Sequence, residues 1–245
     1  GANDHRGGMD GFKTQLDANY GTKLFGKGFN NFTGSFSWRD DTNRATDFNG
    51  SIFNAYNAVE RVALANGTNI NSLFSNINAL SASQQTNLFN IIKSSASQIG
   101  YLSTTQQSAI QSANTLSAMQ SALGINVTDQ ELAARGLTRR DFNMRIGQSK
   151  LLTTQFFVNS EIPINDNHKF YALGGYSNRD GNSAGFYRRP NQSRTYTGLY
   201  ANGFLPEIGS TVVDYSAAGG FKGKLGGFNY DLSNAFGINS FEYNI

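Results

Sequence analysis

The sequence predicts an all-β fold: a segment of an antiparallel transmembrane β-barrel that carries an α-helical extracellular insertion. Three observations support this prediction. Segments of about ten residues alternate between apolar and polar side chains, as expected where a strand points successive side chains to opposite faces. Short turns alternate with long connections along the chain. No run of eighteen apolar residues occurs, so no membrane helix is expected, and barrel strands leave only a weak hydropathy signal.

Residues 1–39 are expected to form the first barrel hairpin. Apolar and polar side chains alternate from Phe12 to Tyr20, and the pattern returns after a glycine-bearing connection at 21–28 and continues to Trp38. A soluble sheet with one solvated face alternates in the same way. Two features favour a membrane wall: the arms are longer than ordinary strands, and aromatic residues mark their ends, where an interfacial girdle would lie.

Residues 40–141 are expected to form the helical extracellular insertion. Apolar residues recur at helical spacing in 51–65 and 71–80. Side chains suited to cap or open helices mark the later starts: Ser81, Ser103 with Gln106, and Thr128 with Glu131. The apolar stripes are narrow, so we expect these helices to pack on each other. A partner-binding or ligand-binding surface is the alternative.

Residues 142–245 are expected to add further barrel strands and a long extracellular loop at 178–210. Alternation marks four strands, at 142–162, 169–179, 211–222 and 228–238. The short connections at 21–28, 163–168 and 223–227 then lie at one end of the sheet, as in outer-membrane barrels with short periplasmic turns. Six strands cannot enclose a wide pore, so they form part of a larger barrel or an open soluble sheet. The alternation continues into the last residues, and we expect a piece of a longer chain.

Composition narrows the functional classes. The chain contains no cysteine, which excludes disulfides and thiol chemistry, and its net charge of +3 is too small to indicate nucleic-acid binding. His5 and His168 do not stand at metal-ligand spacings. Asp40, Asp41 and Asp166 are expected to close turns rather than bind calcium. We find no catalytic constellation, and we expect no enzymatic activity, no metal and no cofactor.

Six short motifs follow one another along nearly the whole chain: RGGMDGFKTQLDANYG at 6–21, ELAARGL at 131–137, MRIGQSK at 144–150, AGFYRRP at 184–190, NGFLPE at 202–207, and YDLS through GIN at 230–239. In this order they resemble the barrel strands of TonB-dependent outer-membrane receptors as found in Bacteroidetes. The resemblance implies a 22-stranded barrel filled by an N-terminal plug. It also implies import of a scarce nutrient (a siderophore, vitamin, oligosaccharide or peptide) across the bacterial outer membrane.

The implied partners are the lipid bilayer, the plug and the remaining barrel strands, the TonB complex that supplies energy, a small extracellular ligand and a surface lipoprotein. The sequence shows no TonB box, plug or remaining strands, so the expected match is the N-terminal part of the barrel. One alternative is a surface structural or adhesive barrel protein that binds a partner through the helical insertion. A soluble sugar-binding or hydrolytic β-domain ranks last, because the strands carry only scattered acidic residues.

The candidate ligand-binding residues are Arg179, Tyr187, Arg188, Arg189 and Arg194, all within the expected loop 178–210. A guanidinium group suits carboxylate or phosphate recognition, so an anionic ligand or a lipopolysaccharide phosphate is a candidate. The alternatives are internal pairing with loop carboxylates and contact with the plug.

Overall fold

The computed structural model describes residues 9–244, which divide into two compact units. The sheet unit comprises residues 9–45, 145–185 and 207–244, and the helical unit comprises residues 46–144 and 186–206. His5 and the first residues of the 6–21 motif lie outside the described residues.

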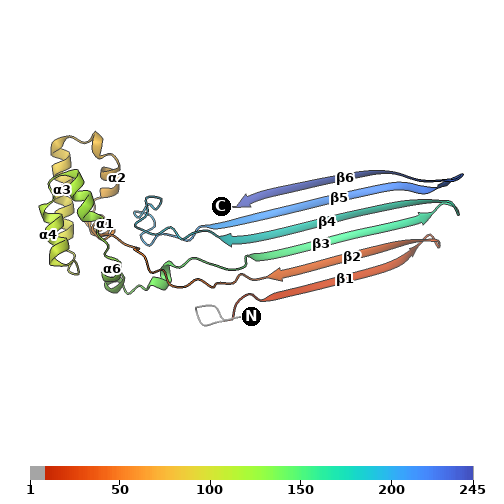
Figure 1. The fold of residues 1–245 in the computed structure, drawn as a ribbon, viewed down its shortest axis with the longest axis horizontal. Helices are drawn as coiled ribbons and strands as arrows, with labels where there is room; N and C mark the ends of the chain where they lie inside the picture. Colours follow the sequence, from red (N-terminus) through yellow and green to blue (C-terminus); the bar gives the residue numbers. More distant parts are fainter. Residues whose placement is uncertain (1–8, 245) are drawn as a thin grey trace. The chain divides into compact units, whose positions relative to one another are not determined.

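The sheet unit is one open, six-stranded antiparallel sheet (Figure 1). Its strands pair in chain order: β1 (Lys13–Leu24), β2 (Gly28–Arg39), β3 (Lys150–Pro163), β4 (His168–Ala184), β5 (Glu207–Leu225) and β6 (Phe228–Asn244). The predicted antiparallel sheet is confirmed, with β1 and β6 as its two edges. The chain is sheet-rich rather than all-β, because the helical unit contributes α1 to α6.

The register sorts the side chains into an apolar face and a polar face. One row across the six strands comprises Ala18, Gly34, Phe156, Tyr176, Tyr215 and Ile238. The neighbouring row comprises Asp17, Ser35, Gln155, Ser177, Asp214 and Asn239. Because adjacent residues of a strand point to opposite sides, these rows lie on opposite faces, as the alternation predicted.

Several predicted boundaries need correction. The second long connection covers 185–206 rather than 178–210, because β4 continues to Ala184 and β5 begins at Glu207. Polar side chains follow Tyr176 on the apolar face of β4, so the hydrophobic alternation stops while backbone pairing continues. Whereas β4 is longer than predicted, β3 is shorter at its start. It begins at Lys150 rather than at 142, because irregular chain precedes it.

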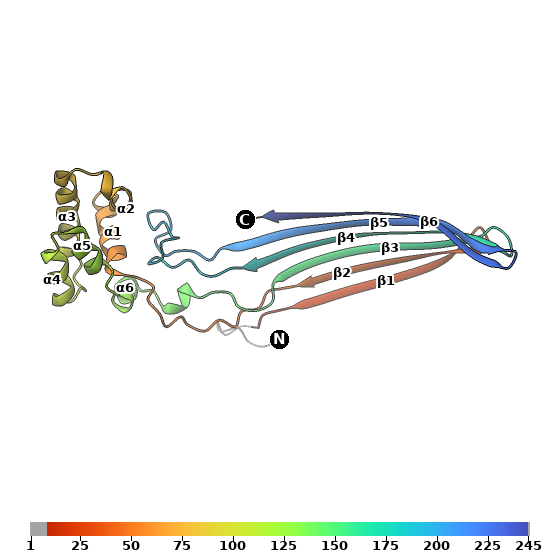
Figure 2. The same ribbon diagram turned by 45° about the horizontal axis from the view of Figure 1, so that its top comes forward.

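The helical unit contains six α-helices and two short 3-10 turns within the described residues. They are α1 (Ala55–Ala65), α2 (Ile70–Ser75), η1 (Ile77–Ala79), α3 (Ala82–Ser97), α4 (Thr104–Ser112), α5 (Leu116–Leu123), α6 (Thr128–Arg135) and η2 (Arg139–Phe142). Figure 2 shows these helices gathered into one group. No helix in residues 9–244 is both long and apolar enough to cross a bilayer.

The predicted starts of three helices are confirmed. Ser81 caps α3, and Ser103 with Gln106 forms a capping box at α4. Thr128 is the first residue of α6, as predicted, and its hydroxyl accepts hydrogen bonds from the backbone N–H groups of Ile52 and Phe53 at 2.8 and 3.1 Å.

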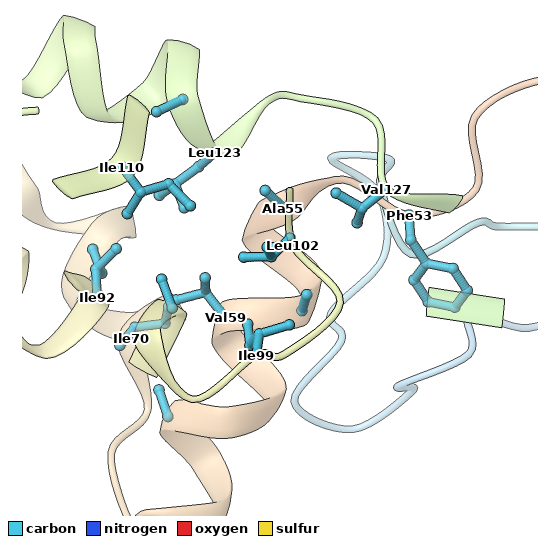
Figure 3. Close-up of a cluster of buried hydrophobic side chains, with 14 of the residues drawn as sticks. Phe53, Ala55, Val59, Ile70, Ile92, Ile99, Leu102, Ile110, Leu123 and Val127 are labelled. Carbon is cyan, nitrogen blue, oxygen red and sulfur yellow. The ribbon is translucent and has the colours of Figure 1, made fainter. Parts of the chain in front are cut away.

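One hydrophobic core joins the helices (Figure 3). Labelled members are Phe53, Ala55, Val59, Ile70, Ile92, Ile99, Leu102, Ile110, Leu123 and Val127. The helices therefore pack on one another, as the narrow apolar stripes predicted. Tyr187, from the second long connection, belongs to the same core although more than forty residues separate it from Phe142, its neighbour there.

Candidate functional site

The apolar face of the sheet carries large exposed side chains. Leu16 is 70% exposed, Phe36 40% and Tyr215 52%. A soluble sheet normally buries such a face beneath a second layer. A continuous apolar surface of this kind marks a site of contact with another apolar phase or molecule.

The apolar face forms a band along the strands. On β5 it runs from Val213 to Phe221, about 27 Å at ~3.4 Å per residue. Aromatic pairs lie near both ends: the ring centroids of Tyr176 and Tyr215 are 5.1 Å apart, and so are those of Phe170 and Phe221. On β4, β5 and β6 the same face turns polar beyond the first pair, with Asn178, Asp180, Asn182, Thr211, Ser240 and Glu242. On β2 and β3 it still carries Trp38 and Leu152 at that level.

The opposite face is crossed by polar contacts between strands. Ser35 Oγ donates to Asp17 Oδ1 at 2.6 Å. Arg179 Nη2 lies 3.3 Å from Asp214 Oδ2. Near the turns, the carboxylate of Glu161 pairs with two lysines, Lys169 at 2.9 Å and Lys222 at 2.7 Å. These contacts make the polar face a connected surface rather than a row of separate side chains.

A shallow hollow of about 290 Å³ lies on this polar face. Residues from four strands line it, and beside the aromatic ring of Phe157 they include the polar side chains of Ser35, Gln155, Ser177, Asp214 and Ser216. Their hydroxyl, amide and carboxylate groups suit a polar protein segment or a hydrated ligand.

The five predicted ligand residues do not form one cluster. Arg179 lies in β4, paired with Asp214. Tyr187, Arg188, Arg189 and Arg194 belong to the loop 186–206 of the helical unit. The loop carries Arg194 exposed, and it fixes Arg188 by two backbone hydrogen bonds with Phe204, at 2.8 and 3.0 Å.

The remaining two residues are buried. The Tyr187 hydroxyl donates to the carbonyl of Asn202 at 2.9 Å, and its ring meets Phe142 edge-on with centroids 5.8 Å apart. The guanidinium carbon of Arg189 lies 3.3 Å from the centroid of the Phe48 ring. The ring contact of Tyr187 with Phe142 and the stacking of Arg189 on Phe48 attach the loop to the rest of the helical unit.

Polar contacts add to this attachment. Asn57 Nδ2 donates to the carbonyl of Pro190 at 3.0 Å, and Asn191 Nδ2 donates to the carbonyl of Ser51 at 3.0 Å. The hydroxyl of Thr197 donates to the buried carboxyl of Glu60. Burial raises the pKa of Glu60 above its ordinary value, although the Thr197 hydrogen bond opposes this change. Sequence reasoning missed Glu60, because nothing in the local pattern shows that its partner lies in a distant loop.

The residues considered for metal binding make ordinary structural contacts. Within residues 9–244 no group of three or more His, Cys, Asp or Glu side chains could hold a metal ion. His168 Nδ1 lies 2.8 Å from the Tyr230 hydroxyl. Asp40 accepts a hydrogen bond from Trp38 Nε1 at 2.8 Å.

Comparison with protein-family models, with curated proteins and with solved structures gives no match. The resemblance to TonB-dependent receptors therefore stays a prediction from the sequence motifs.

Proposed function

We propose that this chain forms part of the barrel wall of a TonB-dependent transporter in the bacterial outer membrane. The observation that supports this most is the pair of unlike faces on one sheet. The apolar band on β5 is about 27 Å along the strand, or roughly 20 Å across a bilayer for a strand tilted by ~40°. Outer-membrane barrels carry an apolar band ~25 Å tall between aromatic girdles.

The open edges of the sheet support the same proposal. Unpaired N–H and C=O groups along β1 and β6 cannot be satisfied in hydrocarbon, so a sheet in lipid must close with further strands. A barrel of 22 strands, as the resemblance implies, would supply them.

In this proposal each part of the chain has a role in import. The apolar face contacts lipid, and the polar face lines a lumen occupied by the plug. The helical unit lies at the outer mouth, where the scarce nutrient (siderophore, vitamin, oligosaccharide or peptide) is captured with or without a surface lipoprotein. The TonB complex then supplies the energy that displaces the plug.

A cysteine scan tests the membrane placement. Because this sequence contains no cysteine, each introduced cysteine is its single labelling site. Single cysteines at Leu16 and Phe36, spin-labelled in vesicles, are expected to be accessible to oxygen dissolved in lipid. Cysteines at the adjacent Gln15 and Ser35 are expected to be accessible to a water-soluble nickel reagent. Equal accessibility of both sets to the nickel reagent would exclude a membrane wall.

Import needs its own test. The full-length protein is expected to bind the periplasmic domain of TonB in a pull-down, and uptake is expected to stop in cells without TonB. The alternative is an adhesive barrel that binds a partner and imports nothing. The separate core of the helical unit supports that alternative, which predicts the same spin-label result without TonB binding.

A further inference from the structure

Arg189 is a buried cation without a matching anion. The residue is 8% exposed, and its Nε is shielded from solvent without a hydrogen-bond partner. Among residues 9–244, no hydrogen bond or ion pair to its guanidinium group occurs, and the group lies over the ring of Phe48. Burial lowers the pKa of Arg189, but an arginine stays protonated, so the positive charge remains.

Nearby acidic groups do not balance this charge. The helical unit contains eight basic and five acidic side chains, so it carries the whole net charge of +3 of the chain. Each of the five acidic side chains has another polar partner: Asp47 with Asn143, Glu60 with Thr197, Asp129 with Arg139, Glu131 with Arg61 and Arg135, and Asp141 with Thr138. The loop 186–206 itself contains three arginines and no acidic residue.

A second polar group without a partner lies six residues further along the loop. Thr195 is buried, and its hydroxyl has no hydrogen-bond partner. Two successive turns separate it from Arg189: Gln192 N–H donates to the carbonyl of Arg189, and Thr195 N–H donates to the carbonyl of Gln192, both at 3.1 Å.

Unsatisfied buried polar groups are rare, and an uncompensated buried charge is costly. We propose that Arg189 binds an oxyanion, a carboxylate or a phosphate group, in the loop 186–206, with the hydroxyl of Thr195 as a further donor. The planar guanidinium matches either oxyanion through two parallel hydrogen bonds. Because it names the chemistry of the imported ligand, this proposal deepens the proposed function and rests on it for biological meaning, but its binding test needs no transport.

Calorimetric titration of the intact protein with inorganic phosphate, and separately with malonate, tests the site. Saturable binding of at least one anion at millimolar concentrations is expected, and the tighter of the two identifies the oxyanion class. Arg189→Gln is expected to weaken this binding by about 10- to 100-fold, the range for loss of charge-assisted hydrogen bonds. Arg140→Gln, which removes an exposed arginine of the same unit, is the matched control and is expected to bind normally.

Two further variants distinguish a loss of anion binding from a loss of folding. Arg189→Lys keeps the charge but loses the two-pronged geometry, so it is expected to bind with intermediate affinity. Arg189→Met fills the space without a charge, so it is expected to leave the unliganded helical unit at least as stable as the wild type and to abolish anion binding. The absence of saturable binding to either anion, or equal binding by the wild type and by folded Arg189 variants, would overturn the site. Failure of TonB binding alongside intact anion binding would reject only the transport proposal.

Discussion

Replacing Phe142 by alanine tests whether the loop 186–206 and the helical insertion form one folded unit. Phe142 is fully buried. Its ring centroid lies 5.3 Å from that of Phe53 and 5.8 Å from that of Tyr187, both in edge-on geometry. It therefore joins the start of the insertion to the loop that follows β4.

The expected cost follows from this burial. Removing a buried phenylalanine side chain lowers the free energy of unfolding by about 3–5 kcal/mol, through lost transfer energy and the cavity that remains. About 0.5–1.5 kcal/mol of that belongs to each edge-on aromatic pair. Phe186→Ala provides the matched control, because Phe186 lies in the same loop but is 74% exposed, and it is expected to change the free energy by less than about 0.5 kcal/mol.

Urea unfolding, followed through the helical circular dichroism signal, measures both variants. Trypsin cleavage after Arg188 and Arg194 reports release of the loop, and Phe142→Ala is expected to accelerate it while Phe186→Ala does not. A double-mutant cycle with Tyr187→Ala isolates the contact between the two segments, with an expected coupling of about 0.5–1.5 kcal/mol. Zero coupling, or equal effects of the two phenylalanine variants, would refute the shared core.

Three further predictions concern the same unit. Because burial raises the pKa of Glu60 above its ordinary 4.5, its contribution to stability is complete below that pH and is lost as pH rises through the raised value. Urea titrations from about pH 4 to about pH 8 should show this slope in the wild type and not in Glu60→Gln, with ~1.4 kcal/mol for each unit of pKa change. Gly203→Ala is expected to cost more than ~1 kcal/mol in the same assay, because φ is +68° and the new Cβ would meet the Arg188 carbonyl; Gly198→Ala, whose Cβ meets only a side chain, is the control. Ser103→Ala is expected to cost ~1 kcal/mol and to speed amide exchange in the first turn of α4 but not of α3.

Features that depend on neighbouring residues could be predicted from the sequence. The period of two between Phe12 and Tyr20 indicated a strand because it reports which side chains share a face. The capping box of Ser103 and Gln106 was predictable because both hydrogen bonds close within three residues. Thr128 was correctly predicted to open α6, but the role of its hydroxyl was not predictable, because its partners Ile52 and Phe53 lie more than seventy residues away.

For the same reason, the prediction that all five candidate ligand residues lie in one loop was correct for only four of them. Arg179 and Arg188 are near in sequence, but β4 continues to Ala184 and carries Arg179 on its polar face. The end of β4 was predicted too early, because the side chains after Tyr176 are polar. Strand pairing uses backbone hydrogen bonds, which continue whatever these side chains are. The burial of Arg189 against Phe48 could not be predicted, because it arises from the packing of two distant segments.

The two units differ in the burial of their apolar side chains, and this difference supports the proposed environment of the sheet. The helical unit encloses its apolar side chains so completely that even a loop tyrosine enters its core. In the sheet unit, many apolar side chains on one face remain exposed, among them Leu16, Phe36 and Tyr215, while hydrogen bonds and ion pairs connect the polar face. A soluble sheet would gain from the reverse, with the apolar face covered and the polar face left to water. Such an arrangement is favoured where something apolar covers the band and something polar fills the opposite side, and the proposed lipid bilayer around a plugged lumen would supply both.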